Sequence, residues 1–168
     1  MIVKTKNNFL HKDDFKNLKD PMLGPDFPWY YNNTKVDKES KDDLNNYQLT
    51  HTFFDGKINS NAYRLIEPVL QKLKVKKLIR VKANLVPRTF RIHKFEAHLD
   101  QEEDYKAAIL YINTNNGYTY FNNGGRNGSD KFVNSKENTI VLFKANQRHY
   151  GTTCTNEKIR VLINFNYQ

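Results

Sequence analysis

The C-terminal half of the chain is a series of short runs rich in β-branched and aromatic residues, separated by turns rich in Asn, Gly and Asp. Runs of this length and composition are typical of β-strands. We place seven of them, at residues 78–86, 92–100, 107–113, 117–122, 139–144, 148–152 and 158–166. Seven short strands after a helical prelude predict a mainly β fold with N-terminal helices, a jelly roll or an allied double-sheet barrel.

The N-terminal part of the chain is less regular and contains several turn signals at proline and glycine. We expect a short helix at residues 11–18 and a strand at about residues 48–54. A second helix should begin after Ser60, because serine is a favoured N-cap residue. Pro68 lies inside this second helix and should kink it or restart it.

Length and composition limit the class of protein. The 168 residues match one ordinary domain, so we expect a single domain in which residues 1–77 support a core formed by residues 78–168. The single cysteine, Cys154, excludes an internal disulfide and a thiolate-rich metal site. No apolar run is long enough to cross a bilayer, and the first residues lack the apolar stretch of a secretory signal. We therefore expect a cytoplasmic protein without membrane contact.

The net charge of +9 is concentrated in residues 72–94, which contain nine basic residues and no acidic one. Such a segment could attract phosphate backbones or acidic substrates, or it could be the solvated face of a strand. Arg80 and Lys82 alternate with Val81 and Ala83, which favours the solvated face. The segment also lacks the interleaved aromatic residues of RNA-binding sheets, so we do not expect a nucleic acid as partner.

Residues 122–135 form a polar, Gly-rich loop, which we interpret as a mobile lid rather than as part of the core. Its glycines do not connect a strand to a helix, so they do not indicate a phosphate-binding loop.

Three residues form a candidate metal site. His98 and Asp100 are two residues apart on a predicted strand, so both side chains should point to the same face. His149 begins another predicted strand about fifty residues later. Two imidazoles and one carboxylate are the ligand set of non-haem Fe(II) oxygenases, although a histidine and an aspartate at this spacing also occur by chance. A nucleophilic pair of His149 and Cys154 is disfavoured, because five residues of separation place the two side chains on opposite faces.

Arg160 is the fourth candidate. It shares one face of a predicted strand with Leu162 and Asn164, while apolar residues occupy the other face. An arginine inside a barrel is costly unless it meets an anion, and its guanidinium group fits a carboxylate through two hydrogen bonds. The alternatives are a structural ion pair, or a surface arginine if the two faces are reversed.

At these positions the chain resembles the Fe(II)/2-oxoglutarate-dependent dioxygenases, in particular the prolyl 4-hydroxylase-like branch and its small phage-encoded members. The resemblance covers roughly residues 78–168 and rests on the spacing of the metal site and on three segments. These segments are Val81-Lys82-Ala83-Asn84-Leu85-Val86-Pro87-Arg88-Thr89, Ala108-Ile109-Leu110-Tyr111-Ile112-Asn113 and His149-Tyr150-Gly151-Thr152-Thr153-Cys154. One glycine of the pattern is missing at Asn116-Gly117-Tyr118-Thr119-Tyr120-Phe121. The resemblance implies a double-stranded β-helix of the cupin-like kind, in the cytoplasm of the host cell if the protein is phage-encoded.

The resemblance also implies the site residues and the cofactors. Fe(II) would be held by His98, Asp100 and His149, with 2-oxoglutarate and O2 at the open positions. Arg160 and Tyr111 would bind the far carboxylate of 2-oxoglutarate, and Asn84 is a weaker candidate for contact with it. The implied activity is hydroxylation of a C–H bond with release of succinate and CO2. An aspartate at position 100, instead of glycine or alanine, argues against a halide-binding halogenase.

The substrate is a peptide or a small molecule. A short lid and an open mouth favour a side chain presented on a peptide, and the family suggests a prolyl residue, over a small metabolite or nucleobase. Steering of acidic or phosphate-bearing partners by the basic segment would agree with a peptide. A different class also fits the predicted fold, namely a jelly-roll binding module without catalysis.

Overall fold

The computed structural model describes residues 3–33, 47–100, 103, 105–122 and 130–168. In chain order the elements are β1 (Lys4–Lys6), α1 (Lys12–Leu23), β2 (Tyr30–Asn32), β3 (Gln48–Asp55), the 3-10 helix η2 (Asn61–Ile66), α2 (Glu67–Leu73), β4 (Leu78–Pro87), β5 (Lys106–Tyr111), β6 (Tyr118–Phe121), β7 (Lys131–Asn134), β8 (Thr139–Lys144), β9 (His149–Gly151) and β10 (Ile159–Tyr167).

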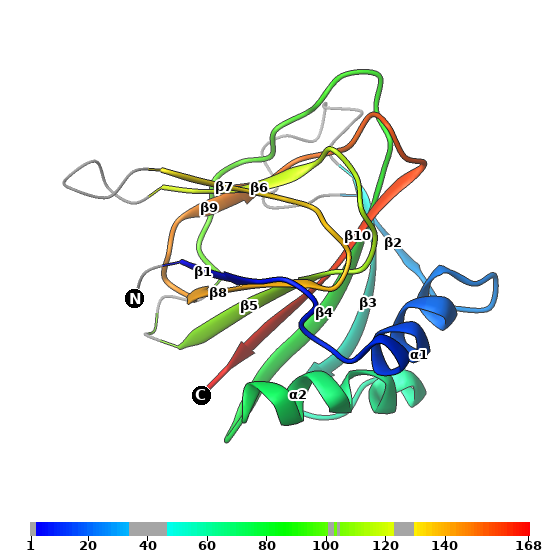
Figure 1. Cartoon of the computed structure of the whole chain (residues 1–168), viewed down its shortest axis with the longest axis vertical. Coiled ribbons are helices and arrows are strands. Elements are labelled where there is room, and N and C mark those ends of the chain that lie inside the picture. Colours follow the sequence, from blue (N-terminus) through cyan, green and yellow to red (C-terminus); the bar gives the residue numbers. More distant parts are fainter. Residues whose placement is uncertain (1–2, 34–46, 101–102, 104, 123–129) are drawn as a thin grey trace.

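The strands form two antiparallel sheets. A large sheet has the order β1-β8-β5-β10-β4-β3-β2, and a small sheet has the order β7-β6-β9. Figure 1 shows the small sheet facing one side of the large sheet, while α1 and α2 cover the opposite side. No helix in the described part of the chain is long and apolar enough to cross a membrane. The predicted mainly β, double-stranded β-helix fold is confirmed.

The large sheet is covered on both faces, and β10 shows how its sequence achieves this. Val161, Ile163 and Phe165 are fully buried and belong to the apolar cluster that packs against the helices. Leu162 belongs to the second apolar cluster, together with residues of β6 and β8. The period of two therefore divides β10 between an apolar layer under the helices and an inner face toward the small sheet.

Both predicted helical regions are helical in the structure, although their bounds differ from the predicted ones. α1 begins after His11 and is longer than the predicted helix, and it buries Phe15, Leu18 and Met22. The Ser60 hydroxyl accepts a hydrogen bond from the Ala62 amide, as expected for an N-cap. The helix that follows is restarted near Pro68, because a 3-10 helix ends at Ile66 and α2 begins at Glu67.

The predicted strand at residues 92–100 is wrong. This segment forms only isolated bridges, Lys94 with Thr152 and His98 with His149. Its backbone still pairs locally with β9, since the His98 and His149 amides donate to each other's carbonyl oxygens at 2.9 and 3.0 Å. The alternating pattern of the segment therefore marks an extended stretch that crosses the end of the small sheet, not a regular strand.

The loop at residues 122–135 is shorter than predicted. Lys131–Asn134 form β7, which pairs with β6 at the edge of the small sheet. Residues 123–129, and with them most of the predicted lid, lie outside the described residues. β7 was not predicted because it has only four residues, of which only Val133 is buried, so it lacks a clear apolar pattern.

The prediction that the basic face of β4 is solvated is also wrong. Val81 and Ala83 are fully buried under the helices, whereas Arg80 and Lys82 point to the inner side and line a pocket. Alternation identifies two faces of a strand but not which one faces water, and here the helices cover the apolar face.

Candidate active site

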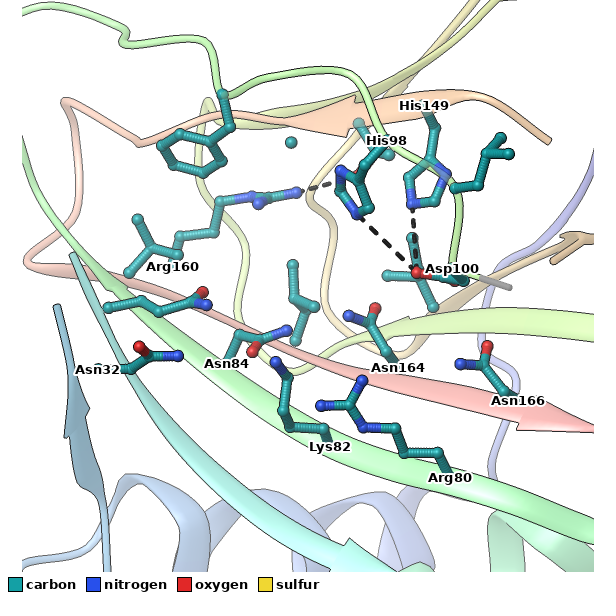
Figure 2. A pocket seen from close by; sticks show the side chains of 18 residues that line it. Asn32, Arg80, Lys82, Asn84, His98, Asp100, His149, Arg160, Asn164 and Asn166 are labelled. Atoms are coloured by element: carbon teal, nitrogen blue, oxygen red, sulfur yellow. Dashed lines mark hydrogen bonds and ion pairs between the residues drawn. The ribbon is translucent and has the colours of Figure 1, made fainter. Parts of the chain in front are cut away.

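A pocket of about 400 Å³ lies between the two sheets. One wall comes from the inner faces of β4 and β10, and the opposite wall comes from β9 and the extended segment before Asp100 (Figure 2). A cavity of this size falls within the range of small-molecule sites. It contains most of the residues that the sequence singles out.

His98, Asp100 and His149 converge in this pocket. Their ligand atoms all lie within 4.8 Å of one another, close enough for the three side chains to bind one metal ion together. Among the described residues, this is the one cluster of three or more His, Cys, Asp or Glu side chains with such spacing. Oδ1 of Asp100 lies 3.9 Å from Nε2 of His98 and 3.8 Å from Nε2 of His149. The backbone pairing of His98 with His149 brings together residues that are far apart in the sequence.

The other nitrogen of each imidazole is bound to the backbone. Nδ1 of His149 lies 2.9 Å from the Gln147 carbonyl oxygen, and Nδ1 of His98 lies 3.2 Å from that of Glu96. These contacts turn both Nε2 atoms toward Asp100, the arrangement that orients metal-binding histidines. Burial, together with the neighbouring His149, lowers the pKa of His98 and favours the neutral imidazole that binds metal.

Aromatic rings hold His149 in place. Phe121 stacks on its ring with centroids 5.5 Å apart, and Phe143 meets it edge-on at 4.9 Å. The His149 side chain is 5% exposed, compared with 32% for His98. The site is thus closed behind His149 and open beside His98. Two imidazoles and one carboxylate without a thiolate suit Fe(II), and one open side leaves room for further ligands.

Arg160 lies across the pocket and is 1% exposed. Its guanidinium group donates to three neutral oxygens, Oγ of Ser135 at 2.7 Å, Oγ1 of Thr119 at 3.1 Å and the Thr152 carbonyl at 3.2 Å. No carboxylate in the described residues forms an ion pair with Arg160, so a structural ion pair is not seen in that part of the chain. A surface arginine is excluded because the side chain is buried. A buried cation without an anion is costly, which indicates a site for an anionic ligand.

Tyr111 and Asn84 differ in their position relative to the pocket, because Asn84 lines it and Tyr111 does not. The Tyr111 ring is buried 5.6 Å from the guanidinium carbon, and its hydroxyl donates to Oγ1 of Thr119 at 2.8 Å. Tyr111 is not among the pocket-lining residues, so it supports Arg160 and Thr119 from behind. Asn84 lines the pocket and is 7% exposed, and its Oδ1 has no hydrogen-bond partner among the described residues.

Among the pocket residues that sequence reasoning did not assign to the site are Arg80, Lys82, Asn164 and Asn166. The signal that could have found them was the register of β4 against β10. Asn84 shares its face of β4 with Lys82 and Arg80, so placing Asn84 in the site would also have placed the two cations there.

A further histidine, His51, and the disfavoured nucleophile Cys154 do not line this pocket. His51 is 3% exposed and packs among Phe27 and Phe53, with Nε2 at 2.7 Å from Oγ of Ser60. Cys154 is buried, and its thiol donates to the Glu157 carbonyl, while burial raises its pKa. A neutral, hydrogen-bonded thiol does not suit a nucleophile.

Comparison with known proteins identifies the fold. A prolyl-4-hydroxylase from Pseudomonas putida aligns over 99% of this chain and 92% of its own, with a TM-score of 0.62 and 14% identity. A prolyl hydroxylase from Trichoplax adhaerens, in complex with a hypoxia inducible factor oxygen degradation domain peptide fragment, aligns over 98% and 82%, with a TM-score of 0.71 and 10% identity. The epimerase SnoN in complex with Fe3+, α-ketoglutarate and nogalamycin RO aligns over 99% and 78%, with a TM-score of 0.65 and 11% identity.

No protein-family model matches the chain, and no curated protein matches its sequence. At 10% to 14% identity the similar structures show a shared fold. The chain has the double-stranded β-helix fold of 2-oxoglutarate-dependent Fe(II) oxygenases. What it does with that fold must be argued from its own pocket.

Proposed function

We propose that this protein is an Fe(II)- and 2-oxoglutarate-dependent dioxygenase that hydroxylates its substrate. The observation that carries the proposal is one pocket in which His98, Asp100 and His149 converge, together with a buried Arg160 that has no carboxylate partner in the described part of the chain (Figure 2). A metal site alone would fit many proteins. A metal site that shares a small cavity with a cation suited to a carboxylate fits a chelating dicarboxylic acid.

Each residue has one task in this proposal. His98, Asp100 and His149 hold Fe(II), and the contacts of the imidazoles with backbone carbonyls keep both Nε2 atoms aimed at it. Arg160 binds the distal carboxylate of 2-oxoglutarate, supported by Tyr111 through Thr119. With iron bound, one atom of O2 would enter the substrate as a hydroxyl group and the other would enter succinate, with release of CO2.

The remaining wall residues position the cosubstrate and limit water. Asn84 lines the pocket with its side-chain amide, while Ile109 and Leu162 add apolar surface. Apolar walls keep solvent away from a charged reaction centre and strengthen the contacts that hold it. A binding module without catalysis would not need three convergent metal ligands.

We extend the proposal to a peptidyl substrate, with a prolyl residue as the first candidate. Two similar structures are prolyl hydroxylases, and one of these contains a peptide fragment, which supports the extension. SnoN has the same fold and is an epimerase, so a small metabolite or nucleobase is the competing substrate. Membership in the small phage-encoded group and a cytoplasmic location are further parts of this proposal, and both rest on the sequence.

The metal and the cosubstrate can be tested without knowing the substrate. Anaerobic addition of Fe(II) and 2-oxoglutarate should give the weak visible charge-transfer band of the chelate. His98→Ala and Asp100→Ala should each abolish the band, because each removes one metal ligand. His11→Asn is the matched control, since His11 is exposed at the start of α1 and its replacement keeps a capping residue.

Two results would count against the proposal. Absence of the band in the wild-type protein would exclude this cofactor pair. A band that survives both substitutions would show that the ligands are other residues. Incubation with Fe(II), 2-oxoglutarate, proline-containing peptides, free amino acids and nucleosides then separates the substrate classes, because the hydroxylated product gains one oxygen in its mass.

A further inference from the structure

Two cations lie on the same wall of the pocket as Arg160 but further along its two strands. Arg80 and Lys82 project from β4 into the cavity, below Asp100 in the view of Figure 2, while Arg160 lies to the other side. On the neighbouring strand β10, Asn166 is paired with Arg80 and Asn164 with Lys82. Directly paired residues of antiparallel strands share a face, so cations and amides form one polar surface.

This surface has unused hydrogen-bonding atoms. The buried side-chain atoms without a partner in the described residues are Nε of Arg80 and the Oδ1 atoms of Asn84, Asn164 and Asn166. All four belong to the pocket wall. Asn166 is 4% exposed, so bulk water does not reach it freely. Buried polar groups are normally paired, and a cluster of unpaired ones in a cavity indicates a missing polar ligand.

The charges of the pocket do not balance. Among the residues that the structure describes, Arg80, Lys82 and Arg160 share the pocket with one lining carboxylate, that of Asp100, which leaves two positive charges. A divalent metal and the dianion 2-oxoglutarate would cancel each other, so the excess would remain after both had bound. The described residues offer no ion-pair partner to Arg80 or Lys82. Asp55, opposite Arg80 on β3, attracts Lys82 but is exposed and forms no ion pair with either cation.

We propose that the substrate carries a carboxylate or phosphate group that binds to Arg80 and Lys82 inside the pocket, and hydrogen-bond donors that bind to Asn164 and Asn166. This inference rests on the proposed function and specifies its substrate class. The anionic group belongs to a free organic acid or phosphate ester, or to an acidic residue beside the oxidised residue of a peptide. The basic segment thus acts by direct contact and not only by long-range steering.

The same cations are not needed for the cosubstrate. Arg160 already provides a buried guanidinium group with two terminal nitrogens on the far side of the pocket. Figure 2 shows Arg80 and Lys82 below Asp100, apart from the guanidinium group of Arg160. Their removal should therefore affect the binding of substrate anions and leave 2-oxoglutarate binding unchanged.

The test uses the full chain loaded with Mn(II) and the inert 2-oxoglutarate mimic N-oxalylglycine. Binding is measured by calorimetry for three matched pairs, glycerol 3-phosphate and glycerol, L-lactate and L-lactamide, and a proline-containing peptide with blocked ends that has aspartate or asparagine beside the proline. The variants are Arg80→Gln and Lys82→Gln, with Lys77→Gln as the control. Lys77 is an exposed cation of the same basic segment. Lys82 has no ion-pair partner in the described residues, so a glutamine there breaks no salt bridge and should not prevent folding.

The wild-type protein should bind the anionic member of at least one pair about tenfold more tightly or better, because a charged group gains charge-assisted hydrogen bonds. Arg80→Gln and Lys82→Gln should each remove most of this preference, whereas Lys77→Gln should keep it. Preference within the peptide pair alone assigns the anion to a peptide, and preference within the other pairs assigns it to a free metabolite.

Equal binding of anionic and neutral members by the wild-type protein would overturn the inference. An equal loss in Lys77→Gln would also overturn it, because a general charge effect would then explain the preference. A fall in 2-oxoglutarate affinity in Lys82→Gln as large as in an Arg160 variant would assign the lysine to the cosubstrate instead. A charge-transfer band without anion preference defeats this inference alone, whereas absence of the band defeats the proposed function.

Discussion

Arg160 is the residue whose environment is hardest to explain without a ligand. Its guanidinium group is buried, and its three described hydrogen bonds go to hydroxyl and carbonyl oxygens that carry no charge. Such contacts orient a cation, but they do not compensate fully for its removal from water. Burial lowers the pKa of Arg160, and an anion in the pocket would reverse this effect.

Arg160→Leu should weaken 2-oxoglutarate binding by about 30-fold to 5,000-fold, the range for loss of one partner of a buried charge pair. Fe(II) affinity should hardly change, because Arg160 is not part of the metal group. Calorimetric titrations with the metal and with the cosubstrate measure both values. Equal losses of the two affinities would indicate a misfolded variant and contradict the assigned role.

The absence of a side chain at Gly117 leaves the space that the Arg160 side chain occupies. A Cβ atom at this position would lie 2.6 Å from Cδ of Arg160 and 2.8 Å from the Thr153 carbonyl oxygen. Because the backbone oxygen cannot move away easily, the arginine must shift. We expect Gly117→Ala to lower 2-oxoglutarate affinity about tenfold and to destabilise the fold by about 1–3 kcal/mol, as overpacking does.

Gly56→Ala provides the control for this substitution. Gly56 has a φ of 67°, and a Cβ atom added there would meet open space, so alanine causes local strain without touching the pocket. Its 2-oxoglutarate affinity should equal that of the wild-type protein. A similar loss of affinity in both glycine variants would mean that general destabilisation, and not displacement of Arg160, causes the effect.

At the scale of single elements, the longer strands of the large sheet were predictable and their surroundings were not. β8 matches its predicted range, and β4 and β10 differ from theirs by one residue at their ends. Strand formation depends on local composition and alternation, which a sequence displays. The covering of β4 by helices is a tertiary contact, and for that reason the prediction placed Arg80 and Lys82 on the wrong side.

The candidate metal site was likewise predictable only in its local part. The sequence predicts that His98 and Asp100 share a face, and the structure places both beside His149. That proximity depends on backbone pairing between segments about fifty residues apart, and no local pattern contains it. From the sequence, only the resemblance to a family suggests that His149 lies beside His98 and Asp100.

The three short strands β1, β2 and β7 were not predicted, because runs of three or four residues are too short for a periodic pattern.

The start of η2 depends on one serine with two tasks. Oγ of Ser60 accepts a hydrogen bond from the Ala62 amide at 2.9 Å and lies 2.7 Å from Nε2 of His51. Ser60→Ala should lower the free energy of unfolding by about 1–2 kcal/mol, because it removes the cap and leaves a buried imidazole nitrogen unpaired. Chemical denaturation measures this change, and Ser60→Thr should restore most of it. A larger loss for threonine than for alanine would contradict the capping role.

At the scale of the whole molecule, the N-terminal residues are part of the sheet that carries the site. β3 pairs with β4 along its length, and the apolar face of β4 and β10 is covered by α1, η2 and α2. A chain reduced to residues 78–168 should therefore not fold, since it would expose the edge of β4 and a large apolar surface. Amide NMR spectra of this fragment should lack dispersion. A well-dispersed spectrum would show that residues 78–168 form an independent unit.

The stability of the metal-free protein should depend on pH through its buried histidines. Burial lowers the pKa of His51 and of His98 below the ordinary value of 6.5. In the range just below 6.5 the unfolded chain therefore binds more protons than the folded one, so the free energy of unfolding decreases as the pH falls. Denaturation of metal-free protein at about pH 7.5 and about pH 5.5 should show lower stability at the acidic value, because carboxylates titrate mainly below this range. His51→Gln should reduce the difference between the two values, because it removes one of the two titrating groups. Equal stability at both values in the wild-type protein would mean that both imidazoles take up protons as readily in the folded state as in the unfolded chain.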